Sequence, residues 1–312
     1  MLVDGEWVGR FAPIDSELAE ESAQGGFVRQ ASQFRHWVGQ SEQFPLESGR
    51  YHLYVAMICP WACRTLMLRA LQGLESVISV SRISPILSEQ GWTFDGWSSD
   101  PDPHLGVSYM HQLYTHADPH YSGRATVPVL WDKQHQTIVN NESADIMQML
   151  NGVFAPLARH ALELRPAHLC EQIDRLSAHY YQNLNNGVYR AGFAQSQSAY
   201  EVAVKAVFEV LEELECELAE RPYRLGQQLT ELDVRLFVTL VRFELAYYSL
   251  FKCNLKSLQQ YPNLCRYVQR IYRLPGIAET VDVESIKRGY YSIETLNPNA
   301  IVPVGPSKLS FT

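Results

Sequence analysis

Apolar residues follow two different periods along this chain, and the change between them divides it near residue 150. In the first half, short β-forming runs alternate with turn residues, and residues 51–56 carry β-formers on both faces, as in a buried strand. After a linker at 151–165, apolar positions recur every three or four residues, the spacing of one helix face. The repeated positions are Tyr200, Val204, Phe208, Leu211, Leu214 and Leu218. The pattern therefore predicts an α/β domain followed by an all-α domain.

The first half predicts the order strand, helix, strand, long insertion, strand, strand, helix. The expected strands are 51–56, 77–81, 126–131 and 137–140, and the expected helices are 60–71 and 141–150. The first strand, the helix after it and the second strand should form a parallel, right-handed unit. Pro128 cannot donate to a ladder, so it belongs at a strand start, where the sequence permits a cis Val127–Pro128 bond.

The helical half contains its own start and stop signals. Thr230 and Asp233 form a capping box, which predicts the start of a long apolar helix through Phe243. Another helix should begin at Pro262 and stop at 274–276, a Leu-Pro-Gly sequence. We expect three parts. They are an N-terminal extension at 1–48, a first domain at 49–152 and an all-helical domain with a C-terminal tail at 166–312.

Two stretches follow neither period. Residues 1–48 are polar and irregular, and we expect them to wrap onto the main body through Phe27, Phe34 and Trp37. The insertion at 84–123 is too long for a passive connection, which favours a functional role. It carries His104, His111, His116 and His120. Because no Cys or paired carboxylate shares a ligand-like spacing with these histidines, we expect solvated loop residues rather than a zinc site.

Composition and charge narrow the class of protein. The chain has 312 residues, 46% of them hydrophobic and 19% charged, which is typical of a soluble globular protein. Its net charge of −8 argues against a nucleic-acid partner. No apolar run is long enough to span a bilayer, and the acidic start does not resemble a signal peptide. The six cysteines form no disulfide framework, as in a reducing compartment, so we expect a cytoplasmic protein.

Cys59 lies where the first predicted strand passes into the first predicted helix. Pro60 pre-sets φ for a first helical turn and has no N–H to leave unpaired there. An isolated cysteine is more often a small buried apolar residue. Here the unpaired N–H groups and the positive end of the helix dipole would stabilise a thiolate. This context favours Cys59 as the catalytic residue.

This arrangement resembles the glutathione transferases, which implies a thioredoxin-like N-terminal domain and an all-helical C-terminal domain. Individual motifs are similar to those of the Xi class, the glutathionyl-hydroquinone reductases. They are Gly25-Gly26-Phe27, Cys59-Pro60-Trp61-Ala62, Gly91-Trp92-Thr93-Phe94, Val127-Pro128-Val129-Leu130-Trp131-Asp132, Asn141-Glu142-Ser143, Phe251-Lys252-Cys253-Asn254, Tyr261-Pro262-Asn263-Leu264 and Tyr290-Tyr291. A Cys-Pro pair alone is shared by several branches, whereas this combination spans nearly the whole chain.

The resemblance implies a glutathione site on the first domain. Trp92 would lie against the tripeptide, unless it is a core aromatic, and the Val127 backbone would pair with the cysteinyl amide. Glu142 and Ser143 would hold the γ-glutamyl end, where helix N–H groups receive its carboxylate. Ser143 would also serve as a helix cap. Arg124 is a candidate for a further anionic contact.

The resemblance also implies an acceptor pocket with Tyr189, Tyr247 and Tyr290, although most of the 17 tyrosines are expected to be packing residues. Cys59 would take glutathione from a glutathionyl-hydroquinone while Tyr189 or Tyr290 protonates the leaving carbon. A second glutathione would then release glutathione disulfide. Glutathione is thus the co-substrate, no metal or nicotinamide is required, and the family implies a homodimer.

Three positions depart from the family pattern. Cys63 stands where His is frequent, and its place one turn into the helix predicts a packed thiol rather than a redox partner. Leu250 and Gly289 replace histidines near the acceptor pocket, which leaves the substrate range open. Two alternatives are an Omega-like thiol transferase or dehydroascorbate reductase, and a non-catalytic binding module of this fold. Activity on a glutathionyl-hydroquinone distinguishes a reductase from both alternatives.

Overall fold

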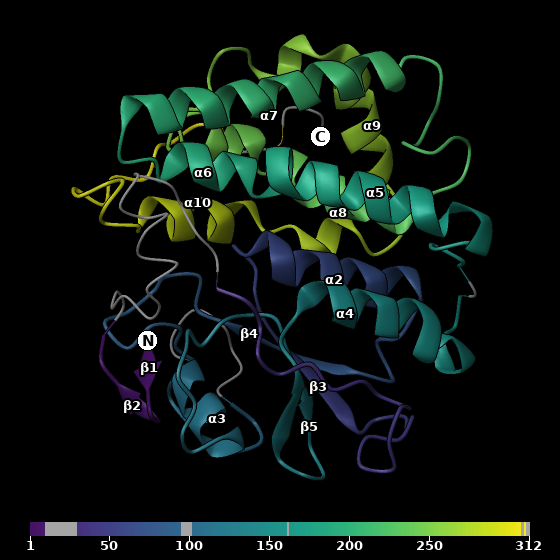
Figure 1. Cartoon of the computed structure of the whole chain (residues 1–312), viewed down its shortest axis with the longest axis vertical. Coiled ribbons are helices and arrows are strands. Elements are labelled where there is room, and N and C mark those ends of the chain that lie inside the picture. The colour runs from purple at the N-terminus through teal and green to yellow at the C-terminus, as the bar shows by residue number, and fades with distance from the viewer. Residues whose placement is uncertain (10–29, 95–101, 161, 307–308, 310–312) are drawn as a thin grey trace. The chain divides into compact units, whose positions relative to one another are not determined.

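The computed structural model describes residues 1–9, 30–94, 102–160, 162–306 and 309, which form two compact units (Figure 1). The first unit contains the described residues of 1–14, 30–162 and 280–285. The second contains those of 163–279 and 286–312. The Gly25-Gly26-Phe27 motif, and with it the expected Phe27 anchor, lies outside the described residues.

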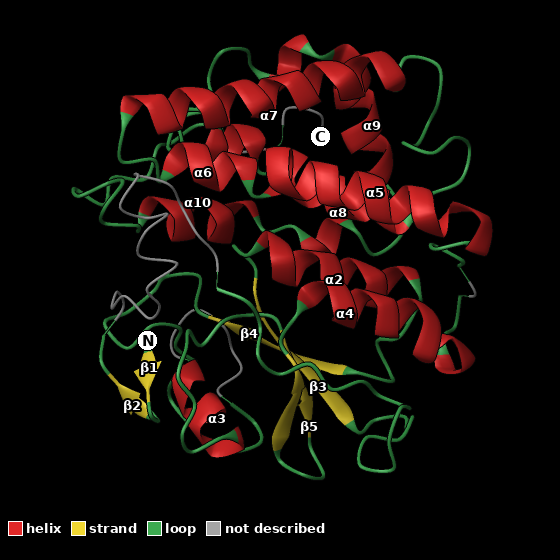
Figure 2. Ribbon diagram, in the orientation of Figure 1, coloured by secondary structure: helices red, strands yellow, loops and turns green. Residues whose placement is uncertain are grey.

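The first unit is built on a four-stranded mixed sheet with the order β4–β3–β5–β6. Its strands are β3 (Tyr51–Ala56), β4 (Ser79–Ile83), β5 (Val129–Asp132) and β6 (Thr137–Asn140). β3 runs parallel to β4 and antiparallel to β5, and all six of its residues are buried, as predicted. Helices α2 (Pro60–Leu71) and α4 (Ser143–Gln148) lie on one side of the sheet, and α3 (Met110–Ala117) lies on the other (Figure 2).

Two strands begin later than their apolar runs predict. β4 starts two residues late because the N–H groups of residues 77 and 78 bond to the Leu74 carbonyl at 3.0 Å, which closes a turn after α2. β5 starts after Pro128, as expected for a residue that cannot donate to a ladder. The Val127–Pro128 bond is cis, which the sequence permitted.

Helix α2 begins where predicted, whereas α4 begins at Ser143, two residues later than expected, and α3 lies in the insertion, where no helix was predicted. Pro60 starts α2, and after its C-cap Gly73 has a φ of 65°, a left-handed conformation that glycine adopts readily. A Cβ on Gly73 would lie 2.7 Å from the Cβ of Arg159. The α-helical part of α4 stops at Gln148, short of residue 150, and continues as a π-helical turn, Met149–Val153.

The first residues form a hairpin, so the expectation of irregular chain is wrong here. β1 (Leu2–Val3) pairs antiparallel with β2 (Glu6–Trp7) across an Asp4-Gly5 turn, a frequent hairpin sequence. Leu2 exchanges two backbone hydrogen bonds of 2.9 Å with Gly123. The hairpin is therefore completed by contacts with the distant insertion, which the local polar composition does not reveal.

Residues 30–48 lie along the first unit, and one of their predicted anchors is confirmed. The Phe34 ring stacks on Tyr121, with ring centroids 5.5 Å apart. Trp37 is only half-buried, whereas Val38 and Phe44 are fully buried. The extension is thus held by aliphatic as well as aromatic side chains.

The insertion at 84–123 contains α3 and two packed histidines, so the expectation that its histidines are solvated is wrong for His104 and His111. His104 packs edge-to-face on buried His52, with ring centroids 4.5 Å apart. Burial lowers the pKa of both rings, and that of His52 falls to about 3. His111 stacks on Trp7 at 4.6 Å. His116 and His120 are exposed, as predicted.

Among the described residues of the second unit, every named element is a helix, which confirms the all-α prediction. Its helices are α5 (Cys170–Tyr180), α6 (Gly187–Gly192), α7 (Gln197–Glu217), α8 (Glu231–Leu240), α9 (Pro262–Tyr272) and most of α10 (Val283–Tyr291). The Thr230–Asp233 capping box starts α8 as predicted, but Phe243 lies beyond it in a π-helical turn, Phe243–Tyr247. Within the described residues, no helix has the length and apolar character needed to cross a membrane.

Candidate active site

Cys59 is the N-cap residue of α2. Its backbone is extended, with φ −76° and ψ 118°, and its N–H bonds to the Ala56 carbonyl at the end of β3 at 2.9 Å. Its side chain is half-buried and makes no capping hydrogen bond. The thiol lies at the positive end of the α2 dipole, which favours a thiolate.

The Val127 carbonyl lies beside this thiol. The Sγ atom of Cys59 donates to the Val127 oxygen at 3.6 Å. Val127 is buried and directly precedes Pro128 and β5, so the sheet fixes its carbonyl while α2 fixes the sulfur. Two residues predicted for the glutathione site are thereby brought together, although their roles in binding stay predictions.

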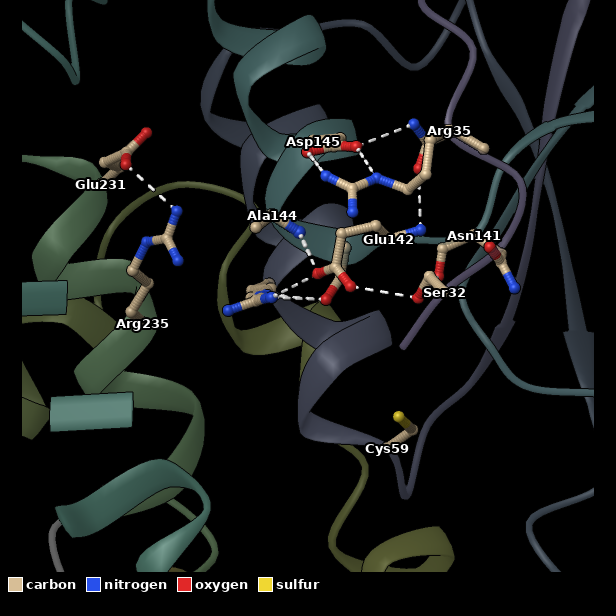
Figure 3. Close-up of polar contacts among 12 residues, drawn as sticks. Ser32, Arg35, Cys59, Asn141, Glu142, Ala144, Asp145, Glu231 and Arg235 are labelled. Carbon is tan, nitrogen blue, oxygen red and sulfur yellow. Dashed lines mark hydrogen bonds and ion pairs between the residues drawn. The ribbon is translucent and has the colours of Figure 1, made fainter. Parts of the chain in front are cut away.

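Glu142 and Ser143 lie at the N-terminus of α4. Glu142 is the N-cap, and its Oε1 accepts from the Ala144 N–H at 3.0 Å while Oε2 accepts from the Ser32 hydroxyl at 3.1 Å (Figure 3). The Glu142 side chain is 29% exposed, so its carboxylate can still meet a ligand. Ser143 is buried and is the first residue of α4, so the expectation that Ser143 caps the helix is wrong, because Glu142 takes the cap position. The pair places a fixed carboxylate beside helix N–H groups.

Arg64 is a site residue that the sequence analysis did not single out. It lies on α2 and is only 4% exposed. Its Nε and Nη2 donate to the Ser143 Oγ at 3.0 and 2.5 Å, and its Nη2 lies 3.5 Å from the Glu142 Oε1. A charge near the start of a largely apolar helix was the available signal, because a buried guanidinium requires a partner.

A second arginine supports the same end of α4. Arg35, from the extension, binds both carboxylate oxygens of Asp145, one of them through Nη2 at 2.9 Å (Figure 3). The Asn140 side-chain amide also donates to Asp145 at 3.1 Å. The first turn of α4 is therefore held by Arg64 from α2 and by Arg35 from the extension.

Trp92 and Arg124 are the other two residues predicted to contact glutathione. Trp92 is half-buried at a bend of the insertion, where its carbonyl accepts from the Met110 N–H at 2.9 Å, so it is not a core aromatic. Arg124 is exposed. Burial, reinforced by the charge of Arg124, lowers the pKa of the Met1 amine to about 5. The contacts of Trp92 and Arg124 with glutathione stay predictions.

The three predicted tyrosines form one cluster within the second unit. The Tyr290 hydroxyl lies 2.6 Å from that of Tyr189 and 2.9 Å from that of Tyr247. Tyr247 and Tyr290 are buried, whereas Tyr189 is half-buried. Desolvation raises the pKa of Tyr247 and Tyr290 well above the usual value, so both phenols remain protonated at neutral pH. The cluster is a continuous chain of hydroxyl groups from the interior to a partly exposed ring.

A close contact with α6 packs this tyrosine cluster. Phe251 lies against all three rings, with centroid distances of 5.2 to 5.5 Å. A Cβ on Gly192 would lie 2.3 Å from the Phe251 ring, so the absence of a side chain at Gly192 allows this approach.

The positions that depart from the family pattern are all buried. The Cys63 thiol donates to the Thr280 carbonyl at 3.3 Å, which shows the packed thiol that its helical position predicts. Leu250 and Gly289 are buried within the second unit. Among the residues that the structure describes, no group of three or more His, Cys, Asp or Glu side chains could hold a metal ion.

Comparisons with known proteins find matches over nearly the whole chain. Residues 58–152 match the family model of the glutathione S-transferase N-terminal domain, and residues 197–270 match that of the C-terminal domain. The chain is 46% identical to the glutathionyl-hydroquinone reductase YqjG of Escherichia coli, over 98% of this chain and 94% of YqjG. It is also 46% identical to the glutathionyl-hydroquinone reductase PcpF of Sphingobium chlorophenolicum, over 99% and 96% of the two chains.

Solved structures show the same relationship. The glutathione-bound structure of E. coli YqjG has a TM-score of 0.88 with 44% identity and covers 98% of this chain and 96% of its own. The glutathione S-transferase Xi of Phanerochaete chrysosporium also has a TM-score of 0.88 with 44% identity, over 91% and 94% of the two chains.

Proposed function

The chain belongs to the Xi class of glutathione transferases, the glutathionyl-hydroquinone reductases, and on this basis we propose that it reduces glutathionyl-hydroquinones to hydroquinones with glutathione as the co-substrate. The observation that carries the proposal is the half-buried Cys59 thiol at the start of α2, 3.6 Å from the Val127 carbonyl. A cysteine at this position can itself attack sulfur, whereas a hydroxyl residue could only stabilise the glutathione thiolate.

We propose that glutathione binds along the first unit with its γ-glutamyl end at α4. The Glu142 carboxylate would receive the ammonium group, and Ser143 with the α4 N–H groups would receive the carboxylate. The main chain of Val127 would pair with the cysteinyl amide, which brings the glutathione sulfur toward Cys59. Trp92 would lie against the peptide, and Arg124 would add an anionic contact.

In the first step the Cys59 thiolate attacks the sulfur of the glutathionyl-hydroquinone. An S–S bond forms, the C–S bond breaks, and the departing ring carbon takes a proton, because an unprotonated aryl carbon is a poor leaving group. Tyr189 or Tyr290 would supply this proton. The products are the free hydroquinone and a Cys59–glutathione mixed disulfide.

In the second step another glutathione thiolate attacks the mixed disulfide. Glutathione disulfide leaves, and Cys59 returns as a thiolate. The two electrons that reduce the carbon thus come from two thiols, and the cycle uses no metal or nicotinamide. We expect this chemistry to take place in the cytoplasm, where the glutathione pool is reduced. We also expect the protein to be a homodimer.

Product analysis tests this function directly. The chain is mixed with glutathione and a glutathionyl-hydroquinone, and hydroquinone and glutathione disulfide are measured over time. We expect equal amounts of both products, their loss in Cys59→Ala, and most of the turnover in Cys63→Ala, because the Cys63 thiol is packed against Thr280. Turnover of a mixed disulfide or dehydroascorbate alone would instead support an Omega-like thiol transferase, and no turnover of any of them would support a binding module.

A further inference from the structure

Arg64 contacts both side chains of the proposed γ-glutamyl site. Arg64 is only 4% exposed, its Cζ atom lies 5.0 Å from the Trp61 ring centroid, and its donors face the first turn of α4. A guanidinium is planar and carries donors in a fixed fork, so it holds two partners in a set relative geometry, whereas the rotatable donors of a lysine ammonium group do not.

The fork fixes the direction of the Ser143 hydroxyl. Both Nε and Nη2 of Arg64 donate to the Ser143 Oγ, at 3.0 and 2.5 Å. A guanidinium only donates, so the lone pairs of Ser143 face Arg64 and the hydroxyl hydrogen must point away from it. Ser143 can therefore serve a ligand as a donor, which suits a carboxylate and not an ammonium group.

Glu142 is fixed in the complementary sense. Its Oε1 accepts from the Ala144 N–H at 3.0 Å and lies 3.5 Å from the Arg64 Nη2, while its Oε2 accepts from the Ser32 hydroxyl at 3.1 Å. Three contacts, from α4 itself, from α2 and from Ser32 of the extension, hold one carboxylate that is 29% exposed. Glu142 can serve a ligand as an acceptor, which suits an ammonium group.

From these contacts we infer that Arg64 is a positioning residue that makes Ser143 a donor beside the Glu142 acceptor, so that the site selects a ligand end carrying a carboxylate beside an ammonium group. The inference rests on the proposed function, because the γ-glutamyl group of glutathione is the ligand end concerned. Arg64 would determine the selectivity for the carboxylate by orienting Ser143, without touching the ligand itself.

Calorimetric titration with three unreactive ligands tests this inference. They are S-methylglutathione, its analogue without the γ-glutamyl carboxylate and its analogue without the γ-glutamyl amine. We expect Arg64→Lys to weaken binding of S-methylglutathione by about tenfold, since the variant keeps the charge and loses the fork. The analogue without the amine should weaken by the same factor. The analogue without the carboxylate should bind equally to both proteins.

Two variants control the experiment. Arg69→Lys changes another α2 arginine, one whose guanidinium donates to the Ile78 and Glu75 carbonyls, and should leave all three affinities unchanged. Ser143→Ala keeps Arg64 and should reproduce the carboxylate-dependent loss, and adding Arg64→Lys to it should cost little more. Should Arg64→Lys fail to fold, Ser143→Ala with the three ligands still decides whether Ser143 reads the carboxylate.

Equal weakening of all three ligands in Arg64→Lys, or no weakening of any, would overturn the inference. The inference would also be overturned if the losses of binding free energy in Arg64→Lys and Ser143→Ala were fully additive in the double variant. The assay uses no hydroquinone, so it separates the two proposals. Binding with the expected selectivity but without hydroquinone formation would overturn the proposed function alone, whereas failure of the wild-type chain to bind S-methylglutathione would overturn both.

Discussion

At the scale of single residues, the buried hydroxyl chain of Tyr247, Tyr290 and Tyr189 combines two properties. Desolvation raises the pKa of the two inner phenols, which keeps their protons in place, and the 2.6 Å contact between Tyr290 and Tyr189 allows a donated proton to be replaced. A phenol used this way needs no change of charge between turnovers. Carbon protonation requires such a donor, whereas cleavage of a disulfide does not.

This difference predicts that Tyr290→Phe slows one half of the reaction only. Release of hydroquinone should slow by roughly a hundredfold, which is the size of the contribution of a general acid. The substitution removes the hydroxyl group that links the other two tyrosines and changes the side-chain volume little. Attack of glutathione on a preformed Cys59–glutathione disulfide should keep its wild-type rate. Single-turnover measurements of the two steps give the comparison, and equal slowing of both would mean that the tyrosines only shape the pocket.

A buried histidine in the first unit predicts acid sensitivity. The pKa of His52 falls to about 3 in the folded chain, first because of burial and then because of His104. An unfolded histidine titrates near 6.5, so the unfolded chain binds more protons between these values. Stability from His52 is therefore complete above pH 6.5 and is lost as the pH falls toward 3.

Between pH 7 and pH 5 we expect the free energy of unfolding to fall by about 2 kcal/mol on account of His52 alone. Urea unfolding at the two pH values measures this loss. His52→Asn should show a smaller fall, while His116→Asn, which changes an exposed ring, should retain the wild-type fall. An unchanged pH dependence in His52→Asn would assign the acid sensitivity to other groups.

At the scale of elements, the sequence predicts a helix or strand well when the residues that fix its ends are close to it in the sequence. Strand β3 and helix α2 follow from an apolar run, a proline and a glycine. The start of β4 depends on a turn closed at Leu74 and could not be located from the strand's own residues, whereas the β1–β2 hairpin has a local Asp4-Gly5 turn signal and is completed by Gly123. Arg64 was missed because its partner Ser143 lies 79 residues away in the sequence.

The β1–β2 hairpin offers a matched pair of substitutions. Gly5 and Gly49 have φ values of 80° and 78°, but a Cβ on Gly5 would lie 1.9 Å from the Pro119 oxygen, whereas nothing lies within 4 Å of one on Gly49. We expect Gly49→Ala to cost about 1 kcal/mol for its left-handed backbone. Gly5→Ala should in addition detach the hairpin.

Hydrogen exchange at residues 2–8 and 121–123 measures this detachment, and urea unfolding measures the cost of each substitution. Faster exchange in Gly5→Ala, with wild-type exchange in Gly49→Ala, is the expected result. Equal behaviour of the two variants would show that the hairpin tolerates the displaced Pro119 carbonyl.

At the scale of the whole molecule, the first unit is discontinuous in sequence, because residues 280–285 belong to it. The carbonyl of Thr280 accepts from the Cys63 thiol on α2, so a late segment closes over an early helix. The sequence pattern predicted a change of period near residue 150 and two successive domains. It could not predict the return of 280–285, because a single short segment carries no period of its own.

A chain ending at residue 162 should therefore have an incomplete first unit. In a Cys59→Ala background, we expect a thiol reagent to label Cys63 much faster in the truncated chain than in the full chain, because Thr280 no longer covers it. Mass spectrometry over time measures the labelling. Equally slow labelling in both chains would show that residues 1–162 protect Cys63 unaided.

The discontinuity also limits how genes for such chains can recombine. A single crossover in the linker at 151–165 would join a first unit from one parent to residues 280–285 from the other. Cys63 of one parent would then pack against residues 280–285 of the other parent. Only parents whose residues match around Cys63 and at 280–285 would give a well-packed hybrid. Cys63 and the 280–285 segment should accordingly be inherited as a pair, even where the two domains have different ancestors.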